Sequence, residues 1–259
     1  MTVDYAFDPG SGIATLRLNR PEAGNALDLP TAETLGRAVR AAAAEPGLRA
    51  VHLTAAGPRF CVGGDVRAFA AQPAGATAYI GAVAEHLHRA VLGLAGLPAP
   101  VLTSVRGSAA GAGFALAMAG DVVLCSSDAR FVLAYAGVGL TPDGGASWFL
   151  SRLVGYRRAA ELTMLNPVVD AEQALAWGLV TRVHDDLDAA AAAELERLAA
   201  GPSRALARTR ALLHGGPGND LATHLDLERH ALLSSTWTAD GAEGIRAFAE
   251  RRPARFTGI

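Results

Sequence analysis

Three glycine-rich segments are the parts of the sequence where backbone groups could approach a ligand most closely. They are residues 60–65 (FCVGGD), 107–114 (GSAAGAGF) and 139–145 (GLTPDGG). The first two each follow a predicted strand and begin a predicted helix, so their N–H groups could face a negatively charged atom. For one such segment alone, an ordinary tight turn is the simpler interpretation. Together, the first two segments favour an oxyanion hole built from backbone donors.

Asp143, in the third segment, carries a carboxyl group that could transfer a proton beside such donors. Because it precedes a predicted helix, capping of that helix is the alternative role. The chain contains no lysine, which excludes Schiff-base catalysis and the lysine of a phosphate-binding loop. Residues 111–113 lack the third glycine of a dinucleotide-binding fingerprint. His86 and His88 lie two residues apart on a predicted helix and so face different sides, and we expect no metal site.

The hydrophobic pattern predicts an α/β body followed by a helical tail. Expected strands cover 3–7, 13–19, 50–54, 101–105, 122–126 and 130–133, and helices between them cover 31–44, 77–94 and 146–154. After Asp170 strand signals nearly vanish, and five helices are expected at 171–177, 187–200, 203–213, 221–235 and 239–250. We place the body at 1–200 and the C-terminal helical region at 201–259, with a hinge at 215–218.

Composition narrows the class of partner. The 259 residues carry a formal net charge of -2 with dispersed charges, so neither nucleic acid nor a membrane surface is expected as a partner. Two cysteines, Cys61 and Cys125, are too few for a secreted disulfide framework. The first eight residues have no signal-peptide pattern, and no apolar stretch is long enough to span a bilayer. A cytoplasmic protein acting on a small molecule is the prediction.

The order of these motifs resembles the crotonase superfamily, also called the enoyl-CoA hydratase/isomerase family. The resemblance runs through most of the chain, over 18–27 (LNRPEAGNAL), 60–65, 107–121, 139–155, 174–183 and 248–253 (FAERRP). It implies a spiral of ββα units with a C-terminal helical trimerisation region, assembled as a homotrimer or a dimer of trimers. It also implies an acyl-CoA substrate, with coenzyme A entering as part of the thioester and no separate cofactor or metal.

Carried over by position, the resemblance assigns the oxyanion donors to the backbone amides of Gly64 and Ala112. Arg20 and Arg67 fall where the family presents cationic side chains to the CoA nucleotide, and solvated surface arginines are the alternative. We expect Tyr135 and Trp148 to shape the acyl pocket. The helical tail is expected to form the contact between subunits.

The chain departs from the hydratase pattern at both glutamates of that mechanism. These positions hold Ala115 and Tyr135, which cannot act as carboxylic acids. Ordinary syn hydration by paired glutamates is therefore not expected. The Pro-Asp-Gly context of Asp143 is most similar to the 1,2-epoxyphenylacetyl-CoA isomerase branch and related Δ3,Δ2-enoyl-CoA isomerases. This similarity implies double-bond isomerisation with Asp143 as the single acid and base.

Two other functions stay open from the sequence. In the 4-chlorobenzoyl-CoA dehalogenase branch the aspartate matching Asp143 is a nucleophile, an aromatic residue matches Tyr135, and a histidine matches His88. A surface histidine is the alternative for His88. A non-catalytic CoA-thioester-binding paralogue would also lack both glutamates, although retention of Asp143 argues against it.

Overall fold

The computed structural model describes residues 1–72 and 75–258. The strands are β1 (Val3–Asp8), β2 (Ile13–Leu18), β3 (Ala50–Ala55), β4 (Val101–Val105), β5 (Ser108–Ala110), β6 (Val122–Ser126), β7 (Arg130–Val132), β8 (Val169–Asp170) and β9 (Arg182–His184). The helices are α1 (Leu29–Ala43), α2 (Val66–Ala70), α3 (Ala76–Ala95), α4 (Ala112–Ala117), α5 (Ala146–Leu153), α6 (Gly155–Met164), α7 (Ala171–Ala176), α8 (Leu187–Ala199), α9 (Ser203–Gly215), α10 (Leu221–Thr236) and α11 (Ala239–Ala249). Short 3₁₀ helices are η1 (Pro21–Ala23), η2 (Tyr135–Val138) and η3 (Gly216–Gly218).

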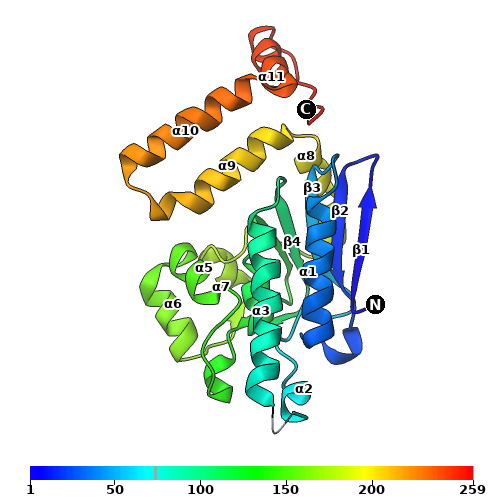
Figure 1. Cartoon of the computed structure of the whole chain (residues 1–259), viewed down its shortest axis with the longest axis vertical. Coiled ribbons are helices and arrows are strands. Elements are labelled where there is room, and N and C mark those ends of the chain that lie inside the picture. Colours follow the sequence, from blue (N-terminus) through cyan, green and yellow to red (C-terminus); the bar gives the residue numbers. More distant parts are fainter. Residues whose placement is uncertain (73–74, 259) are drawn as a thin grey trace.

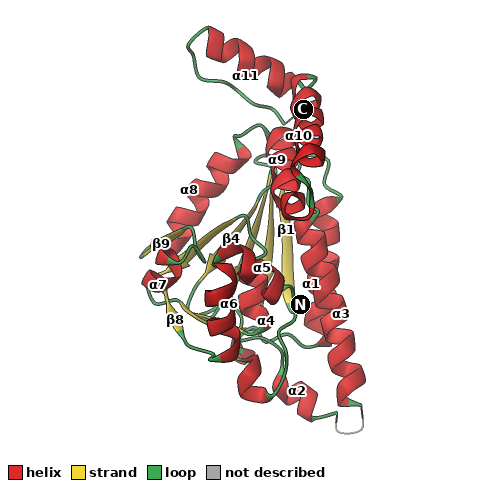
Figure 2. Cartoon of the chain, turned by 90° about the vertical axis from the view of Figure 1, so that its left-hand side faces the viewer, coloured by secondary structure: helices red, strands yellow, loops and turns green. Residues whose placement is uncertain are grey.

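The body is built on two sheets. The larger has the order β1-β2-β3-β4-β6-β9; its β1–β2 pair is antiparallel and the remaining pairs are parallel. The smaller has the order β5-β7-β8. Helices α1 and α3 cover one face of the larger sheet and α8 covers the other, as Figures 1 and 2 show. Coverage of parallel strands on both faces explains why every residue of β4 is buried.

Helix α1 shows how local sequence determines where a helix begins and which face it buries. Asp28 is its N-cap and accepts a hydrogen bond from the Thr31 amide, and Pro30 occupies the first turn, where a missing N–H costs nothing. Leu35, Val39 and other residues at spacings of three and four are buried. The helix therefore packs one apolar stripe onto the sheet and α3.

The tail helices extend away from the sheet, and α10 lies alongside α9 (Figure 1). No residue of α10 is buried in this chain. In contrast, Arg210 of α9 is only 5% exposed; it contacts Asp121 at 2.6 Å and donates to the carbonyls of Leu94 at 2.6 Å and Ala95 at 2.7 Å. The buried guanidinium of Arg210 therefore links α9 to Asp121 and to the C-terminal end of α3. The predicted boundary at 200/201 falls between α8 and α9, and the expected hinge corresponds to η3.

One expectation about the second half is corrected. Strands were predicted nearly to vanish after residue 170, but β9 pairs with β6 in parallel, with Arg182 opposite Leu124. A three-residue strand is too short to show a period of two, so the pattern could not reveal it. Helix α6 was also not expected. Across residues 1–72 and 75–258, no helix is both long and apolar enough to cross a membrane.

Candidate active site

An apolar cavity of about 280 Å³ lies among α2, α3 and η2. Both glycine-rich segments that predict an oxyanion hole reach its wall, through Gly64 and Ala112. Tyr135 and Asp143 line the same cavity. Apolar side chains, including Leu87 of α3 and Leu140, complete much of the lining. The structure thus brings together four of the residues that the sequence analysis singled out.

The Gly64 amide is aimed by the hydrogen bonds on either side of it. The Leu27 amide donates to the Gly63 carbonyl at 2.8 Å, and the Asp65 amide donates to the Leu27 carbonyl at 3.0 Å. In a trans peptide the N–H and the preceding C=O point in opposite directions. Because the Gly63 carbonyl points at Leu27, the Gly64 N–H points away from Leu27. Among the described residues it has no acceptor, and Gly64 lines the cavity.

The orientation of the Ala112 amide, at the start of α4, is also fixed by neighbouring main-chain hydrogen bonds. The Gly111 carbonyl accepts hydrogen bonds from Phe114 at 3.0 Å and Ala115 at 3.1 Å, as the first turn of a helix requires. The first N–H groups of a helix have no partner inside the helix, which leaves Ala112 free to donate to a ligand. Ala112 also lines the cavity.

The two donor segments lie side by side. The Ala110 amide donates to the Cys61 carbonyl at 2.8 Å, which joins the segments in a short parallel ladder. Gly63 has φ +96°, and a Cβ there would lie 2.9 Å from the Ala110 oxygen and 3.5 Å from the Ala112 nitrogen. Only glycine permits this approach. Glycine at 63 therefore lets the segments that carry Gly64 and Ala112 pack together at the wall of one cavity.

Asp143 faces this region from the opposite segment. Its Oδ1 accepts a hydrogen bond from the Tyr135 hydroxyl, and its side chain is 31% exposed. Helix α5 has Gly145 as its N-cap with no side-chain cap, so Asp143 does not cap the helix. Burial first, and then the charge of Asp143 and the hydrogen bond to it, raise the pKa of Tyr135. Tyr135 is therefore a neutral donor at physiological pH.

Comparison with known proteins decides the family. The chain matches the enoyl-CoA hydratase/isomerase family over residues 8–258. The chain belongs to this family, the crotonase superfamily. It is 36% identical over 250 residues to the 1,2-epoxyphenylacetyl-CoA isomerase of Escherichia coli K12, covering 95% of each chain. It is 30% identical over 247 residues to 4-chlorobenzoyl coenzyme A dehalogenase-1 of Arthrobacter sp., covering 93% of this chain and 88% of the relative.

The fold agrees with this assignment. A crystal structure of a putative enoyl-CoA hydratase/isomerase from Mycobacterium abscessus superimposes with a TM-score of 0.93 at 33% identity, covering 99% of this chain and 100% of that one. The predicted crotonase fold with C-terminal helices is therefore confirmed. The isomerase relative also agrees with the branch that the sequence resembled.

The positions of the two hydratase glutamates lie close to Asp143. Tyr135 is hydrogen-bonded to it. Ala115 is fully buried, and a Cβ built on Gly144 would lie 3.2 Å from the Ala115 methyl group. Residue 115 thus lies under the turn that follows Asp143. Of the described residues that line the cavity, Asp143 is the only one with a carboxyl group.

His88 of α3 stands beside the same turn. Its Nε2 accepts a hydrogen bond from the Gly144 amide at 3.2 Å and lies 4.0 Å from Asp143 Oδ2. The 4.0 Å separation is too long for a hydrogen bond between His88 and the Asp143 carboxylate. Half of the His88 side chain is exposed. The structure therefore places His88 near the carboxylate but outside the lining of the cavity.

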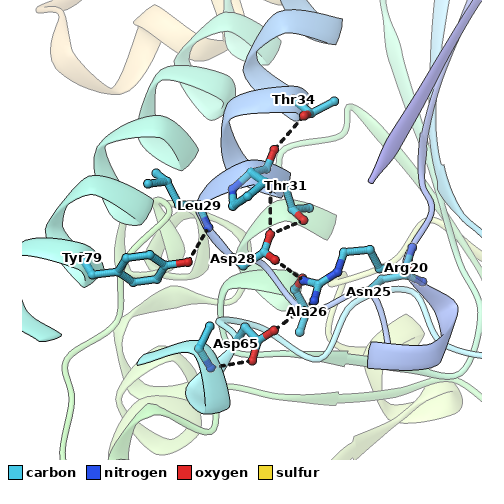
Figure 3. Close-up of polar contacts among 11 residues, drawn as sticks. Arg20, Asn25, Ala26, Asp28, Leu29, Thr31, Thr34, Asp65 and Tyr79 are labelled. Atoms are coloured by element: carbon cyan, nitrogen blue, oxygen red, sulfur yellow. Dashed lines mark hydrogen bonds and ion pairs between the residues drawn. The ribbon is translucent and has the colours of Figure 1, made fainter. Parts of the chain in front are cut away.

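Arg20 is occupied within the fold, as Figure 3 shows. Its guanidinium lies 3.0 Å from Asp28 and 3.2 Å from Asp65, and also donates to the Ala26 carbonyl at 2.8 Å. Asp28 caps α1, and Asp65 caps α2 immediately after the Gly64 donor. Arg20 therefore ties the oxyanion segment to α1, with its charge balanced by two carboxylates.

A second cavity of about 560 Å³ shares Val62, Gly64 and Val66 with the apolar one. We call it the polar cavity because charged side chains line it: Arg20, Glu22, Arg59, Asp65 and Arg67. Arg67 lines it, and so does Arg59, which the sequence analysis missed. Both side chains are exposed, and neither forms an ion pair with a residue that the structure describes. The position of Arg59 just before the first glycine-rich segment was the signal that could have indicated it.

Trp148 lies away from the cavity lining in this chain. Helix α5 buries Ala146, Phe149 and Leu150, so its helical phase turns residue 148 to another side. The indole is 41% exposed, stacks 6.3 Å from the ring of His214 on α9, and carries the guanidinium of Arg152 at 3.8 Å. The structure places Trp148 between the body and the tail rather than at the acyl pocket.

Proposed function

We propose that this protein isomerises a carbon–carbon double bond in an acyl-CoA thioester, with Asp143 as the single acid and base. The observation that carries the proposal is that one carboxylate faces the same apolar cavity as two unpartnered backbone amides. Hydration by two glutamates would need a second carboxyl group, and the described lining has none. The isomerase relative at 36% identity supports the same function.

The first step uses the backbone donors. The thioester carbonyl oxygen binds between the amides of Gly64 and Ala112, which stabilise the negative charge that develops when a proton leaves the acyl chain. A fixed donor of this kind contributes about 3–4 kcal/mol to the transition state in well-studied enzymes. Both amides are held by their own segments before substrate binds, so little reorganisation is required.

The second step moves one proton. A carboxylate oxygen of Asp143 takes a proton from the γ-carbon, and the electron pair of that C–H bond passes into a dienolate whose charge rests on the thioester oxygen. The same carboxyl group then returns the proton to the α-carbon, and the double bond moves by one position. The net reaction consumes nothing, so one carboxylate and no further cofactor or metal suffice.

We assign the CoA portion to the polar cavity. Arg67 and Arg59 line it and form no ion pair with a residue that the structure describes, while Asp65 of the same lining is paired with Arg20. The two arginines can therefore attract phosphate groups. This cavity meets the apolar one at Val62, Gly64 and Val66. An acyl-CoA that occupied both cavities would therefore place its thioester group next to the Gly64 amide. Arg20, which the sequence analysis also assigned to CoA, would act instead through the position of Gly64.

The experiment that tests this function combines isomer analysis with isotope exchange. Acyl-CoA esters of straight-chain and aromatic-ring-derived types are incubated in D₂O, and isomers and deuterium content are followed by mass spectrometry. We expect positional isomers with deuterium at the α- and γ-carbons, and Asp143→Asn to retain thioester binding while exchange falls about 10²- to 10⁴-fold. Exchange that is unchanged in Asp143→Asn would remove Asp143 from the mechanism, and no exchange with any ester would favour a binding protein.

Hydrolytic dehalogenation is the second candidate. Its support is the dehalogenase relative together with His88, whose Nε2 lies 4.0 Å from Asp143. In that reaction Asp143 would attack the halogen-bearing ring carbon and expel halide, and water would then cleave the resulting ester. Chloride release from a chlorobenzoyl-CoA ester, measured beside the exchange assay, separates the two functions.

We also propose that the protein assembles as a homotrimer or a dimer of trimers through its tail, and that it acts in the cytoplasm. Helix α10 buries nothing in the single chain, yet exposes several large apolar side chains: Leu225, Leu227, Leu232 and Leu233. Such a surface is typical of a protein interface. Light scattering on the purified protein measures the mass of the assembly directly.

A further inference from the structure

The two oxygens of the Asp143 carboxylate are in different situations. Oδ1 accepts the hydrogen bond from the Tyr135 hydroxyl. No hydrogen bond from any described residue reaches Oδ2, whose nearest ion-pair partner is His88 Nε2 at 4.0 Å. The same side chain therefore has one oxygen held by the protein and one left for other chemistry.

We propose that Tyr135 is a positioning residue, which fixes Oδ1 of Asp143 by donating a hydrogen bond to it and thereby makes Oδ2 the oxygen that transfers the proton. The inference rests on the proposed function of Asp143 as acid and base. It assigns to Tyr135 a role different from that of an acyl-pocket wall. A carboxylate held at one oxygen cannot rotate freely, so the other oxygen keeps one orientation toward the substrate.

Tyr135 suits this role because it stays protonated and is itself held in place. Its ring packs against the main hydrophobic core and its hydroxyl is largely withdrawn from solvent. The Tyr135 amide donates to the Leu133 carbonyl at 2.8 Å, and the Leu140 amide donates to the Tyr135 carbonyl at 3.0 Å. The residue is therefore fixed through both backbone groups as well as through its ring.

The other titratable groups near this pair donate no hydrogen bond to the carboxylate. Burial raises the pKa of the Cys61 thiol to about 12, so Cys61 stays neutral. On the α3 side, His88 Nε2 accepts a hydrogen bond from the Gly144 amide and lies 4.0 Å from Oδ2, beyond hydrogen-bond distance. Tyr135 is thus the one hydrogen-bond donor to the Asp143 carboxylate among the residues that the structure describes.

The hydroxyl also favours the ionised form of the carboxylate, since a donor stabilises negative charge. Two separable consequences follow. Loss of the hydroxyl should lower kcat through lost orientation. It should also let the carboxylate take up a proton at higher pH, so the acid limb of the kcat profile moves upward. A wall residue whose removal only loosened the pocket would change KM and leave that acid limb in place.

The test compares Tyr135→Phe with Tyr5→Phe. Tyr5 also donates to a carboxylate, Glu45, at 2.9 Å, but on β1 away from the cavity, so its loss is a matched change outside the site. For Tyr135→Phe we expect kcat to fall about 10-fold and the acid limb to move up by about one pH unit, with binding of a saturated acyl-CoA unchanged. For Tyr5→Phe we expect the wild-type kcat and pH profile.

A second variant guards against misfolding. Incorporation of 3-fluorotyrosine at position 135 keeps the ring and hydroxyl but makes a stronger donor, so the acid limb should move to lower pH. An acid limb that stays in place in both Tyr135 variants overturns the inference. The inference about Tyr135 can fail while the proposed function stands: this is the result if the acid limb does not move but Asp143→Asn abolishes exchange in the same assays. If the wild-type protein shows no exchange at all, the proposed function itself is wrong.

Discussion

The two sides of the cavity are made in different ways. On one side the proposed reactive groups are the backbone amides of Gly64 and Ala112, oriented by neighbouring hydrogen bonds between main-chain atoms. On the other side they are the side chains of Asp143 and Tyr135, with His88 next to them. The first arrangement is independent of side-chain identity, whereas the second depends on it completely. The difference explains how one fold can keep a thioester site while its reaction changes with a few side chains.

The largest effect should come from removing a backbone donor without disturbing its side of the cavity. Ala112 is the first residue of α4, a position where proline is tolerated. Ala112→Pro therefore removes one donor at little cost to the helix, and we expect kcat to fall about 10²- to 10³-fold. Ala112→Ser keeps the amide and should behave like wild type. Equal activity in both variants would show that this backbone group does not act on the substrate.

A smaller effect should follow from releasing the segment that carries the other donor. Arg20 joins Asp28 and Asp65 with a guanidinium only 18% exposed, so Arg20→Gln leaves two partly buried carboxylates without their cation. We expect the free energy of unfolding, measured in urea, to fall by about 1–3 kcal/mol. Turnover should fall as well, since Asp65 directly follows Gly64.

Arg20→Lys is the control for that prediction. It restores the charge but not the planar fork that reaches two carboxylates at once, so it should recover only part of the stability. Full stability in Arg20→Gln would mean that the backbone hydrogen bonds alone hold the Gly64 amide.

The pH dependence of folding stability must be distinguished from the pH dependence of catalytic activity. Burial lowers the pKa of His52 to about 4, despite the opposing influence of Asp188. Between pH 6.5 and 4 the unfolded chain binds a proton that the folded chain does not, so stability should fall as pH falls through this range.

We expect this loss to be about 3 kcal/mol at most and to be absent in His52→Gln, as measured by urea unfolding at several pH values. His230→Gln, on exposed α10, should keep the wild-type dependence. A pH dependence that is unchanged in His52→Gln would contradict the assignment. Any acid limb in activity that persists in His52→Gln then belongs to the site.

The backbone side of the cavity could be predicted from the sequence, and the side-chain side only in part. Paired glycines following strands indicate where amides become free, because glycine alone permits the conformation of Gly63. The candidate Asp143 also lies at the cavity, since its segment is short and enclosed by glycines. Neither its hydrogen bond to Tyr135 nor the contact of His88 with Gly144 could be predicted, because each depends on how a separate element packs.

The same limit explains what the sequence could not show about other side chains. Arg20 lines the polar cavity, but its charge is shared by two carboxylates from other segments. Trp148 is turned from the cavity by the phase of α5, which buries Phe149 and Leu150 instead. In the fold, long helices were predicted well, whereas the strand β9 was missed because three residues are too few to show an alternating pattern and its partner β6 is distant in the sequence.

The smallest effect should distinguish an arginine that binds substrate from one that holds the fold. Arg67 is exposed in the polar cavity, with no ion pair to a described residue, whereas Arg20 is paired twice. We expect Arg67→Ala to raise KM about two- to fivefold with kcat and stability unchanged, and the difference to shrink as salt screens the phosphate contact. Arg37→Ala, on the exposed side of α1, serves as the control for lost surface charge. A fall in kcat with constant KM would instead show that Arg67 acts on the position of the Gly64 amide. Arg67 would then be a positioning residue, like Arg20, and not a residue that binds substrate.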